Sequence, residues 1–251
     1  MKRNATVIFQ NALQMIMNER WRRRCLWFHY FLYLVLEFQS VLSVSQDDPN
    51  LVIIYTDEQN FRTLGCYRDL LKETKQDEIW GRGVTVATPN INALARKGAL
   101  FTKFYAASPV CTPARASFLT GLYPHTLDMM DNGSFLDTNI RTFANVLQER
   151  NYYTGYVGKW HLSGKQTPGI DIPPMQKAGF NDTRFAFNRG HWQYFDDRKG
   201  GKMSAYSSKV SAKHVNKNYS TDFIVDKGIE FLKERKNKKN PFALMISIPD
   251  P

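Results

Sequence analysis

A continuous apolar run that ends in polar residues is the feature that most constrains how this chain folds. Residues 51–55 read Leu-Val-Ile-Ile-Tyr, and residues 57–60 read Asp-Glu-Gln-Asn. A short apolar run bounded by polar residues is typical of a strand that is buried in a parallel sheet. Open α/β sheets bind their ligands at the carboxyl ends of such strands. We therefore expect the side chains that follow this strand, with Asp57 first, to lie in a cleft.

Helical and strand-like segments alternate along the rest of the chain. The patterns predict a helix over 89–97 followed by a strand-like stretch at 100–105, and a second helix over 140–147 followed by a strand at 153–157. A final helix leads into another apolar run at 242–248. This alternation predicts an α/β fold with a mostly parallel central sheet that helices cover on both faces.

Composition divides the chain into regions. Residues 1–45 form a basic leader, and residues 46–251 hold the alternating segments. Within the second region, residues 163–219 contain prolines at 168, 173 and 174 and a long polar run. We expect this segment to be an irregular insertion that shapes the rim of the site.

The leader has the three-part pattern of a secretory signal peptide. An arginine cluster at 20–24 precedes an apolar stretch of 12 residues at 25–36, and small residues follow at 43–45. A membrane-spanning helix needs about 20 apolar residues. We therefore expect export with cleavage near Ser45, to a lysosomal, extracellular or periplasmic destination, and no stable membrane span. An uncleaved anchor is the alternative, because Glu37 interrupts the run and no clean cleavage site follows.

Two segments carry the formal net charge of +11. Residues 1–24 contribute +5, residues 199–239 contribute +7, and the remainder sums to −1. A basic leader and one basic surface segment explain this balance without a nucleic-acid groove. Neither a zinc-finger spacing nor an aromatic RNA-binding motif is present in the sequence. We expect no nucleic-acid partner.

Cysteine is rare, and one copy stands in a chemically suggestive place. Removal of the leader leaves only Cys66 and Cys111, so a disulfide between them is one interpretation. Cys111 stands two residues before Pro113 and four before Arg115, at the predicted start of a helix. Such a helix start attracts anions, and the Arg115 guanidinium offers a planar fork of donors to the same anion. A plain thiolate nucleophile is an alternative role for Cys111.

These residues resemble a known family. Cys111-Thr-Pro-Ala-Arg115, within the stretch 88–125, is similar to the C-x-P-x-R signature of formylglycine-dependent sulfatases, which belong to the alkaline-phosphatase superfamily. Residues 49–60 resemble the first metal-binding strand of that family, and Gly-Lys-Trp-His at 158–161 resembles its Lys-x-His segment. Order and spacing agree from about residue 49 to the end. The resemblance implies the N-terminal part of an alkaline-phosphatase-like α/β sandwich, incomplete at its C-terminus.

The resemblance also implies a nucleophile made from Cys111. In the family this cysteine is oxidised to formylglycine before folding, by a formylglycine-generating enzyme. One hydroxyl of the hydrated aldehyde attacks the sulfur of a sulfate ester and displaces the alcohol of the ester; loss of a proton from the other hydroxyl then expels sulfate and restores the aldehyde. By the same resemblance Arg115 stabilises the hydrated aldehyde, Lys159 binds sulfate oxygens, and His161 donates a hydrogen bond to the hydrate or the sulfate.

A divalent cation completes the implied site. The resemblance points to Ca2+, with Asp57, Glu58 and the converted Cys111 as ligands. Glu58 stands where many relatives have a second aspartate. Further family ligands, a histidine and an Asp-Asn or Asp-His pair, would follow Pro251. We expect this chain to be a fragment or a truncated product that binds metal poorly and turns over little substrate by itself.

The expected function is therefore sulfate-ester hydrolysis of a sulfated glycan or aryl sulfate. A phosphoester hydrolase of the same superfamily and a non-catalytic protein that binds sulfated glycans are the alternatives. The basic segment 199–239 fits guidance of a polyanionic glycan, but a solvated basic face is the simpler explanation of its charge.

Overall fold

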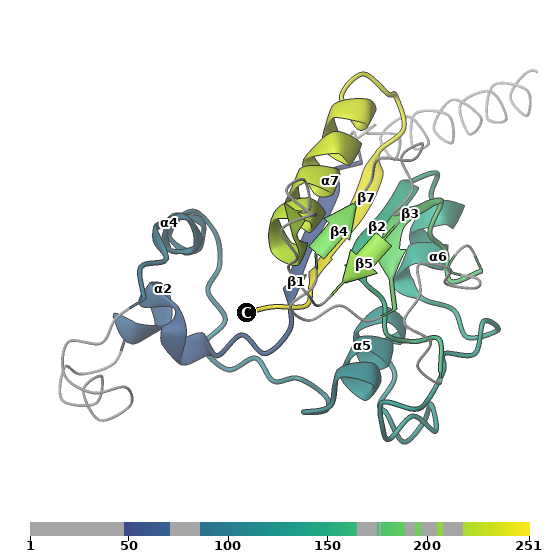
Figure 1. Ribbon diagram of the computed structural model, residues 1–251, viewed down its shortest axis with the longest axis horizontal. Coiled ribbons are helices and arrows are strands. Elements are labelled where there is room, and N and C mark those ends of the chain that lie inside the picture. The colour runs from purple at the N-terminus through teal and green to yellow at the C-terminus, as the bar shows by residue number, and fades with distance from the viewer. Residues whose placement is uncertain are drawn as a thin grey trace, which may run out of the picture. The chain divides into compact units, whose positions relative to one another are not determined.

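A parallel four-stranded sheet organises the described part of the chain (Figure 1). The computed structural model describes residues 48–70, 86–164, 175, 177–188, 194–196, 205–207 and 218–251. All the elements below belong to the unit Pro49–Pro251. The predicted signal peptide, residues 1–45, lies outside the described residues.

The central sheet has the order β1-β7-β2-β3, and each neighbouring pair is parallel. Its strands are β1 (Leu51–Thr56), β7 (Phe242–Ile248), β2 (Tyr153–Lys159) and β3 (Asp182–Phe187). Because every strand runs the same way, all four carboxyl ends meet at one edge of the sheet. The expectation of a mostly parallel central sheet is confirmed.

Helices cover both faces of this sheet. Alternate residues of β2 point to opposite faces, so Tyr156 enters one apolar cluster and Val157 enters the other. Helices α5 (Cys111–Thr120) and α6 (Phe143–Glu149) contribute Ala116 and Ala144 to the cluster of Tyr156. The long helix α7 (Ser220–Arg235) packs along β7 and contributes Phe223, Ile224 and Phe231 to the cluster of Val157 (Figure 1).

The position of β1 corrects one prediction. The strand forms where the apolar run predicts it, but among the described residues it pairs only with β7 and lies at the edge of the sheet. The exposed fraction reaches 44% at Val52 and 65% at Ile54. An apolar run shows that a strand tolerates burial on both faces, but it carries no information about the order of strands in a sheet.

Two further predictions differ from the structure. Residues 100–105 form no strand, and they expose Phe101, Phe104 and Tyr105. The segment expected to be irregular, 163–219, contains β3 of the central sheet. It also contains a small antiparallel sheet of order β5-β4-β6, formed by β4 (Tyr194–Asp196), β5 (Ala205–Ser207) and β6 (Asn218–Tyr219). Strand pairing of these short segments depends on distant partners, which local composition does not reveal.

Three short elements lie in the described part of the segment between β1 and α5, residues 57–70 and 86–110. They are η1 (Phe61–Thr63), α2 (Gly65–Arg68) and α4 (Pro89–Lys97), the last in agreement with the predicted helix. The Thr88 Oγ1 and Asn92 Oδ1 atoms accept hydrogen bonds from the backbone N–H groups of Gly65 and Cys66, at 2.9 and 2.8 Å. These contacts tie α2 to α4. None of the helices in the described ranges is long and apolar enough to cross a membrane.

Candidate active site

Three neighbouring strands deliver polar residues to one edge of the sheet. Asp57 follows β1, and its backbone N–H donates to the Ile248 carbonyl at the end of β7, at 3.0 Å. Lys159 is the last residue of β2, and Ser247 is the penultimate residue of β7. The expectation that the carboxyl end of the first strand carries buried polar groups is confirmed at Asp57.

Asp57 is a single carboxylate that contacts two buried cations. Its Oδ1 atom lies 2.5 Å from the Arg115 Nη2 atom, and its Oδ2 atom lies 2.6 Å from the Lys159 Nζ atom. All three residues are at most 6% exposed. Burial is the largest influence on the Asp57 pKa and raises it, but Arg115 and Lys159 together outweigh burial and hold that pKa below its ordinary value. One negative and two positive charges leave this cluster with a surplus positive charge, which favours an anionic ligand.

The second terminal nitrogen of Arg115 is bound to the ends of β2 and β7. Its Nη1 atom donates to the Lys159 carbonyl at 2.6 Å and to the Ser247 Oγ atom at 2.7 Å. The Tyr156 hydroxyl donates to the same carbonyl at 2.6 Å. Burial lowers the pKa of Arg115, and the nearby Tyr156 and Asp57 raise it beyond its ordinary value. Arg115 is therefore both a charge in the site and a structural tie between α5 and the sheet.

Cys111 begins helix α5. The N-cap is Val110, Cys111 is the first helical residue, and Pro113 is the third. The prediction that Cys111 lies next to the helix N-cap is confirmed. Cys66 and Cys111 are both half-buried free cysteines, so the interpretation of a disulfide between them is wrong.

The start of α5 is linked to the segment that follows β2. The Thr112 hydroxyl is completely buried and donates to the His161 carbonyl at 2.9 Å. His161 is also buried and has a positive φ of 58°, which is uncommon for a residue other than glycine. The structure therefore brings the backbone of His161 close to the residue that follows Cys111.

A glycine allows β2 and β7 to approach closely beside Lys159. Gly158 has a φ of 101°, and a Cβ atom built there would lie 1.9 Å from the Ser247 carbonyl oxygen. Any side chain at this position would therefore collide with the backbone of β7.

Sequence reasoning missed three polar residues that organise the site, namely Thr112, Tyr156 and Ser247. Ser247 had a recognisable signal, because it is the single polar residue in the run Phe-Ala-Leu-Met-Ile-Ser-Ile. Thr112 and Tyr156 had no such sequence signal, because threonine and tyrosine are common core residues in helices and strands.

A cavity of about 560 Å3 opens beside this cluster. Three of the predicted site residues, Asp57, Glu58 and Cys111, line it, together with residues of the loops on either side. Arg115, Lys159 and His161 are buried and are not part of its lining. Three of the six predicted residues thus line the cavity, Arg115 and Lys159 contact one of these, Asp57, and the His161 backbone contacts Thr112.

The described residues do not by themselves form a calcium site. Ca2+ takes six to eight oxygen ligands in proteins. The described residues contain no group of three or more histidine, cysteine, aspartate or glutamate side chains that could hold a metal. Both oxygens of Asp57 contact cations, and Glu58 is exposed. The assignment of Asp57, Glu58 and Cys111 as ligands stays a prediction, supported by their position around one cavity.

The fold and the site define a class of protein: a parallel α/β domain with a buried, cation-rich cluster at the carboxyl ends of its strands. The chain belongs to the sulfatase family, whose sequence profile matches residues 49–251. An N-acetylglucosamine-6-O-sulfatase of Bacteroides thetaiotaomicron is 31% identical over 199 residues, which are 78% of this chain and 29% of that protein. Human arylsulfatase A is 36% identical over 150 residues, 57% of this chain and 26% of that protein.

Solved structures agree with this assignment. A putative sulfatase from Bacteroides fragilis aligns with a TM-score of 0.62 and 26% identity, covering 82% of this chain and 44% of that one. A protein solved in complex with its substrate D-glucosamine-2-N,6-O-disulfate aligns with a TM-score of 0.53 and 28% identity, covering 80% of this chain and 34% of that one. The predicted sulfatase-type, alkaline-phosphatase-like sandwich is confirmed. The chain spans 29% and 38% of the lengths of the first two curated relatives.

Proposed function

We propose that this chain supplies the nucleophile-bearing part of a sulfuric ester hydrolase. The observation that carries the proposal is the position of Cys111, which begins α5 and shares a cavity with Asp57. Asp57 in turn contacts Arg115 and Lys159, whose combined charge exceeds its own. A sulfate group that enters this cavity would meet the start of the helix, and the two cations contact Asp57, which lines the cavity.

Position 111 suits the modification that the family resemblance implies. Cys111 is unpaired and half-buried at the cavity wall, so its Sγ atom is not held by a disulfide. When formed, formylglycine would supply the group that attacks the sulfur of the ester. The partner that makes it would be a formylglycine-generating enzyme, and the leader 1–45 would direct the chain to an exported compartment.

The chain's own residues would position and neutralise the substrate. Lys159 would bind sulfate oxygens, with its ammonium held by Asp57. Arg115 would stabilise negative charge at position 111, since its guanidinium is fixed by Asp57, Ser247 and the Lys159 carbonyl. His161 would donate a hydrogen bond to the sulfate. Its backbone is held against Thr112, one residue after Cys111.

Asp57 and Glu58 would contribute oxygen ligands to a Ca2+ ion. The ion would supply positive charge that stabilises the leaving sulfate. Because the described residues hold only part of an oxygen shell, we expect the chain alone to bind Ca2+ weakly. No step assigned here to a side chain depends on the ion.

A sulfated glycan or an aryl sulfate is the proposed substrate. Relatives that support the first are the N-acetylglucosamine-6-O-sulfatase and an ulvan-active sulfatase of Formosa agariphila, which is 31% identical over 218 residues. Human arylsulfatase A supports the second.

The test begins with the modification of Cys111. The chain would be expressed with a formylglycine-generating enzyme, and mass spectrometry of the peptide that contains residue 111 would measure conversion. Hydrolysis of nitrophenyl sulfate and nitrophenyl phosphate would then be compared in the wild type, Cys111→Ala and Cys66→Ala. Cys66 is the matched control, because it is the other half-buried free cysteine and lies outside the lining of the cavity.

Three results would decide the proposal. Conversion of Cys111 together with a low level of sulfate hydrolysis that only Cys111→Ala abolishes is the expected result. Preferential hydrolysis of the phosphate ester would identify a phosphoester hydrolase. Tight binding of a sulfated glycan by a chain that stays unmodified at Cys111 would identify a non-catalytic binding protein.

A further inference from the structure

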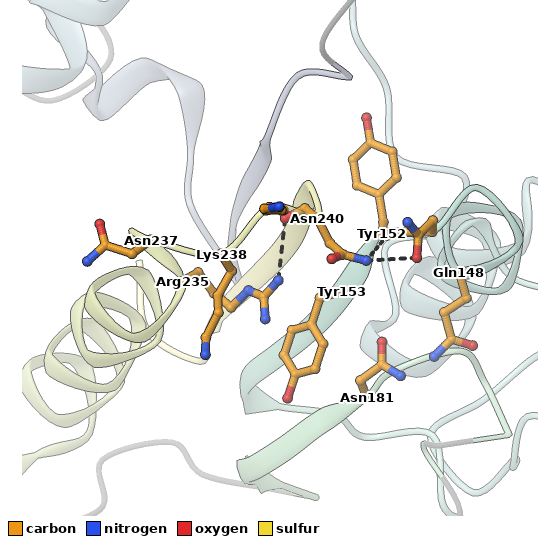
Figure 2. Close-up of a pocket in the computed structure, with 10 residues that line it drawn as sticks. Gln148, Tyr152, Tyr153, Asn181, Arg235, Asn237, Lys238 and Asn240 are labelled. Atoms are coloured by element: carbon orange, nitrogen blue, oxygen red, sulfur yellow. Dashed lines mark hydrogen bonds between the residues drawn. The ribbon is translucent and has the colours of Figure 1, made fainter.

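A second cavity lies at the opposite end of the central sheet from Asp57. Its volume is about 700 Å3. Tyr153, the first residue of β2, lines it, and so does Arg235, the last residue of α7 (Figure 2). Lys159, at the site described above, is the last residue of β2. The second cavity and the Asp57–Lys159 ion pair are therefore at opposite ends of the same strand.

The lining of this cavity is positively charged. It contains Arg235, Lys238 and Lys239 and no aspartate or glutamate. None of these three cations forms an ion pair within the described ranges of the chain. Two carboxylates, Asp182 and Glu234, act electrostatically on Tyr153, and the Arg184 guanidinium binds both, at 2.8 and 2.7 Å. The lining itself carries a surplus of positive charge.

Arg235 is held in place but retains unused donors. Its guanidinium carbon lies 4.2 Å from the centroid of the Tyr153 ring. Figure 2 shows its one hydrogen bond, a long contact of 3.4 Å from Nη2 to the Asn240 carbonyl. The Nε atom is buried and has no hydrogen-bond partner in the described structure. Buried donors without partners are rare in folded proteins, and they mark places where a ligand or water is bound.

Amide side chains line the same cavity. Figure 2 shows Gln148 and Asn181 on one side of Tyr153 and Asn240 above it. The Asn240 Nδ2 atom donates to the Asn151 Oδ1 atom at 2.8 Å, which joins the loop before β7 to the loop before β2. Amides donate and accept hydrogen bonds with sugar hydroxyls, and a guanidinium binds sulfate or carboxylate groups through paired donors. This combination of cations, amides and an aromatic ring suits an anionic saccharide.

We propose that this cavity is a second binding site for an anionic saccharide, with the acidic group bound by Arg235, Lys238 and Lys239 and the hydroxyls bound by the amides. The ligand would be a sulfated or carboxylated sugar unit bound without being hydrolysed. The site includes the end of the basic segment 199–239, for which the sequence analysis raised guidance of a polyanionic glycan without locating a binding site. The proposal concerns binding alone and does not depend on turnover at Cys111.

Binding of a heparin tetrasaccharide and of its desulfated counterpart to the full chain would test the site, measured by calorimetry at two salt concentrations. The double variant Lys238→Gln/Lys239→Gln should lower affinity about tenfold or more, because it removes two charge-assisted contacts. The matched control is Lys97→Gln/Lys103→Gln, which removes the same charge from exposed residues outside this cavity. All these variants keep the basic residues 1–24, so any attraction to that segment is common to them.

The proposal expects unchanged tetrasaccharide affinity in the Lys97/Lys103 control and weaker binding in the Lys238/Lys239 variant. Equal losses in the two lysine variants would show nonspecific attraction and would overturn the proposal. So would equal affinity for the desulfated sugar, or equally tight binding of a DNA duplex.

Discussion

The Lys159 Nζ atom donates a hydrogen bond to the Asp57 carboxylate at 2.6 Å, although the two residues are 102 positions apart in the chain. The contact exists because β1 and β2 both run parallel to β7, which lies between them. Arg115 reaches the other oxygen of the same carboxylate from α5. The proposed catalytic groups are therefore also part of what holds the fold together, and substitutions there should change stability as well as activity.

Arg115→Lys should destabilise the protein strongly. A lysine has one ammonium group and cannot replace the contacts of two guanidinium nitrogens with Asp57, Ser247 and the Lys159 carbonyl. We expect the free energy of unfolding to fall by about 3 kcal/mol, as measured by urea denaturation. The control Arg141→Lys changes an ion pair with Glu149 whose side chains are 62% and 63% exposed, so it should cost about 0.5 kcal/mol or less. Equal losses in the two variants would contradict the role given to Arg115.

Asp57→Asn should change how stability depends on pH. In the unfolded chain this carboxyl has a pKa of about 3.9, while in the folded chain Arg115 and Lys159 hold its pKa lower, against the opposing effect of burial. The stabilisation is therefore complete above the unfolded pKa and is lost as the pH falls through the folded pKa. The variant should be less stable than the wild type at neutral pH, and the difference should shrink as the pH falls below about 4.

Urea denaturation from about pH 3 to about pH 7 would measure this difference. Asp69→Asn serves as the control, because Asp69 is exposed and forms no ion pair within the described residues. A difference between wild type and Asp57→Asn that stays constant with pH would show that Asp57 has an ordinary pKa.

Gly158→Ala should disrupt the junction of β2 and β7. The new methyl group would meet the Ser247 carbonyl oxygen, and the φ of 101° is unfavourable for alanine. We expect a loss of about 3 kcal/mol or more in the free energy of unfolding. Gly121→Ala is the matched control, because Gly121 has a φ of 73° with no atom within 4 Å of an added Cβ, so it should cost only about 1 kcal/mol. Similar losses would mean that backbone strain alone, without the collision, determines the effect.

Asp250→Ala should weaken the start of α7. The Asp250 Oδ2 atom accepts hydrogen bonds from the Ser220 and Thr221 hydroxyls, at 2.8 and 3.1 Å, and these are the first two residues of the helix. A carboxylate at a helix N-terminus also interacts favourably with the helix dipole. We expect a loss of about 2 kcal/mol, measured by thermal denaturation. Asp226→Ala, on the exposed face of the same helix, should have little effect, and a comparable loss there would argue against the cap.

The sequence alone determined the local elements and the candidate chemistry. The runs at 51–55, 153–157 and 242–248 are strands, and Cys111 lies at a helix start as the position of Pro113 suggested. Such features depend on neighbours within a few residues, and periodicity and capping preferences report those neighbours directly. The six candidate site residues were identified because they stand within motifs that resemble those of sulfatases.

Only the tertiary structure decided how these parts combine. In the described sheet β1 lies at an edge, and β3 forms within a segment that was expected to be irregular. Arg115 and Lys159 both form ion pairs with the carboxylate of Asp57. The tertiary structure also assigned structural roles to Ser247 and to Gly158, which no local pattern required. The reason is physical: strand order, burial and ion pairing are set by contacts between residues far apart in the chain, and their energies do not appear in any short stretch of sequence.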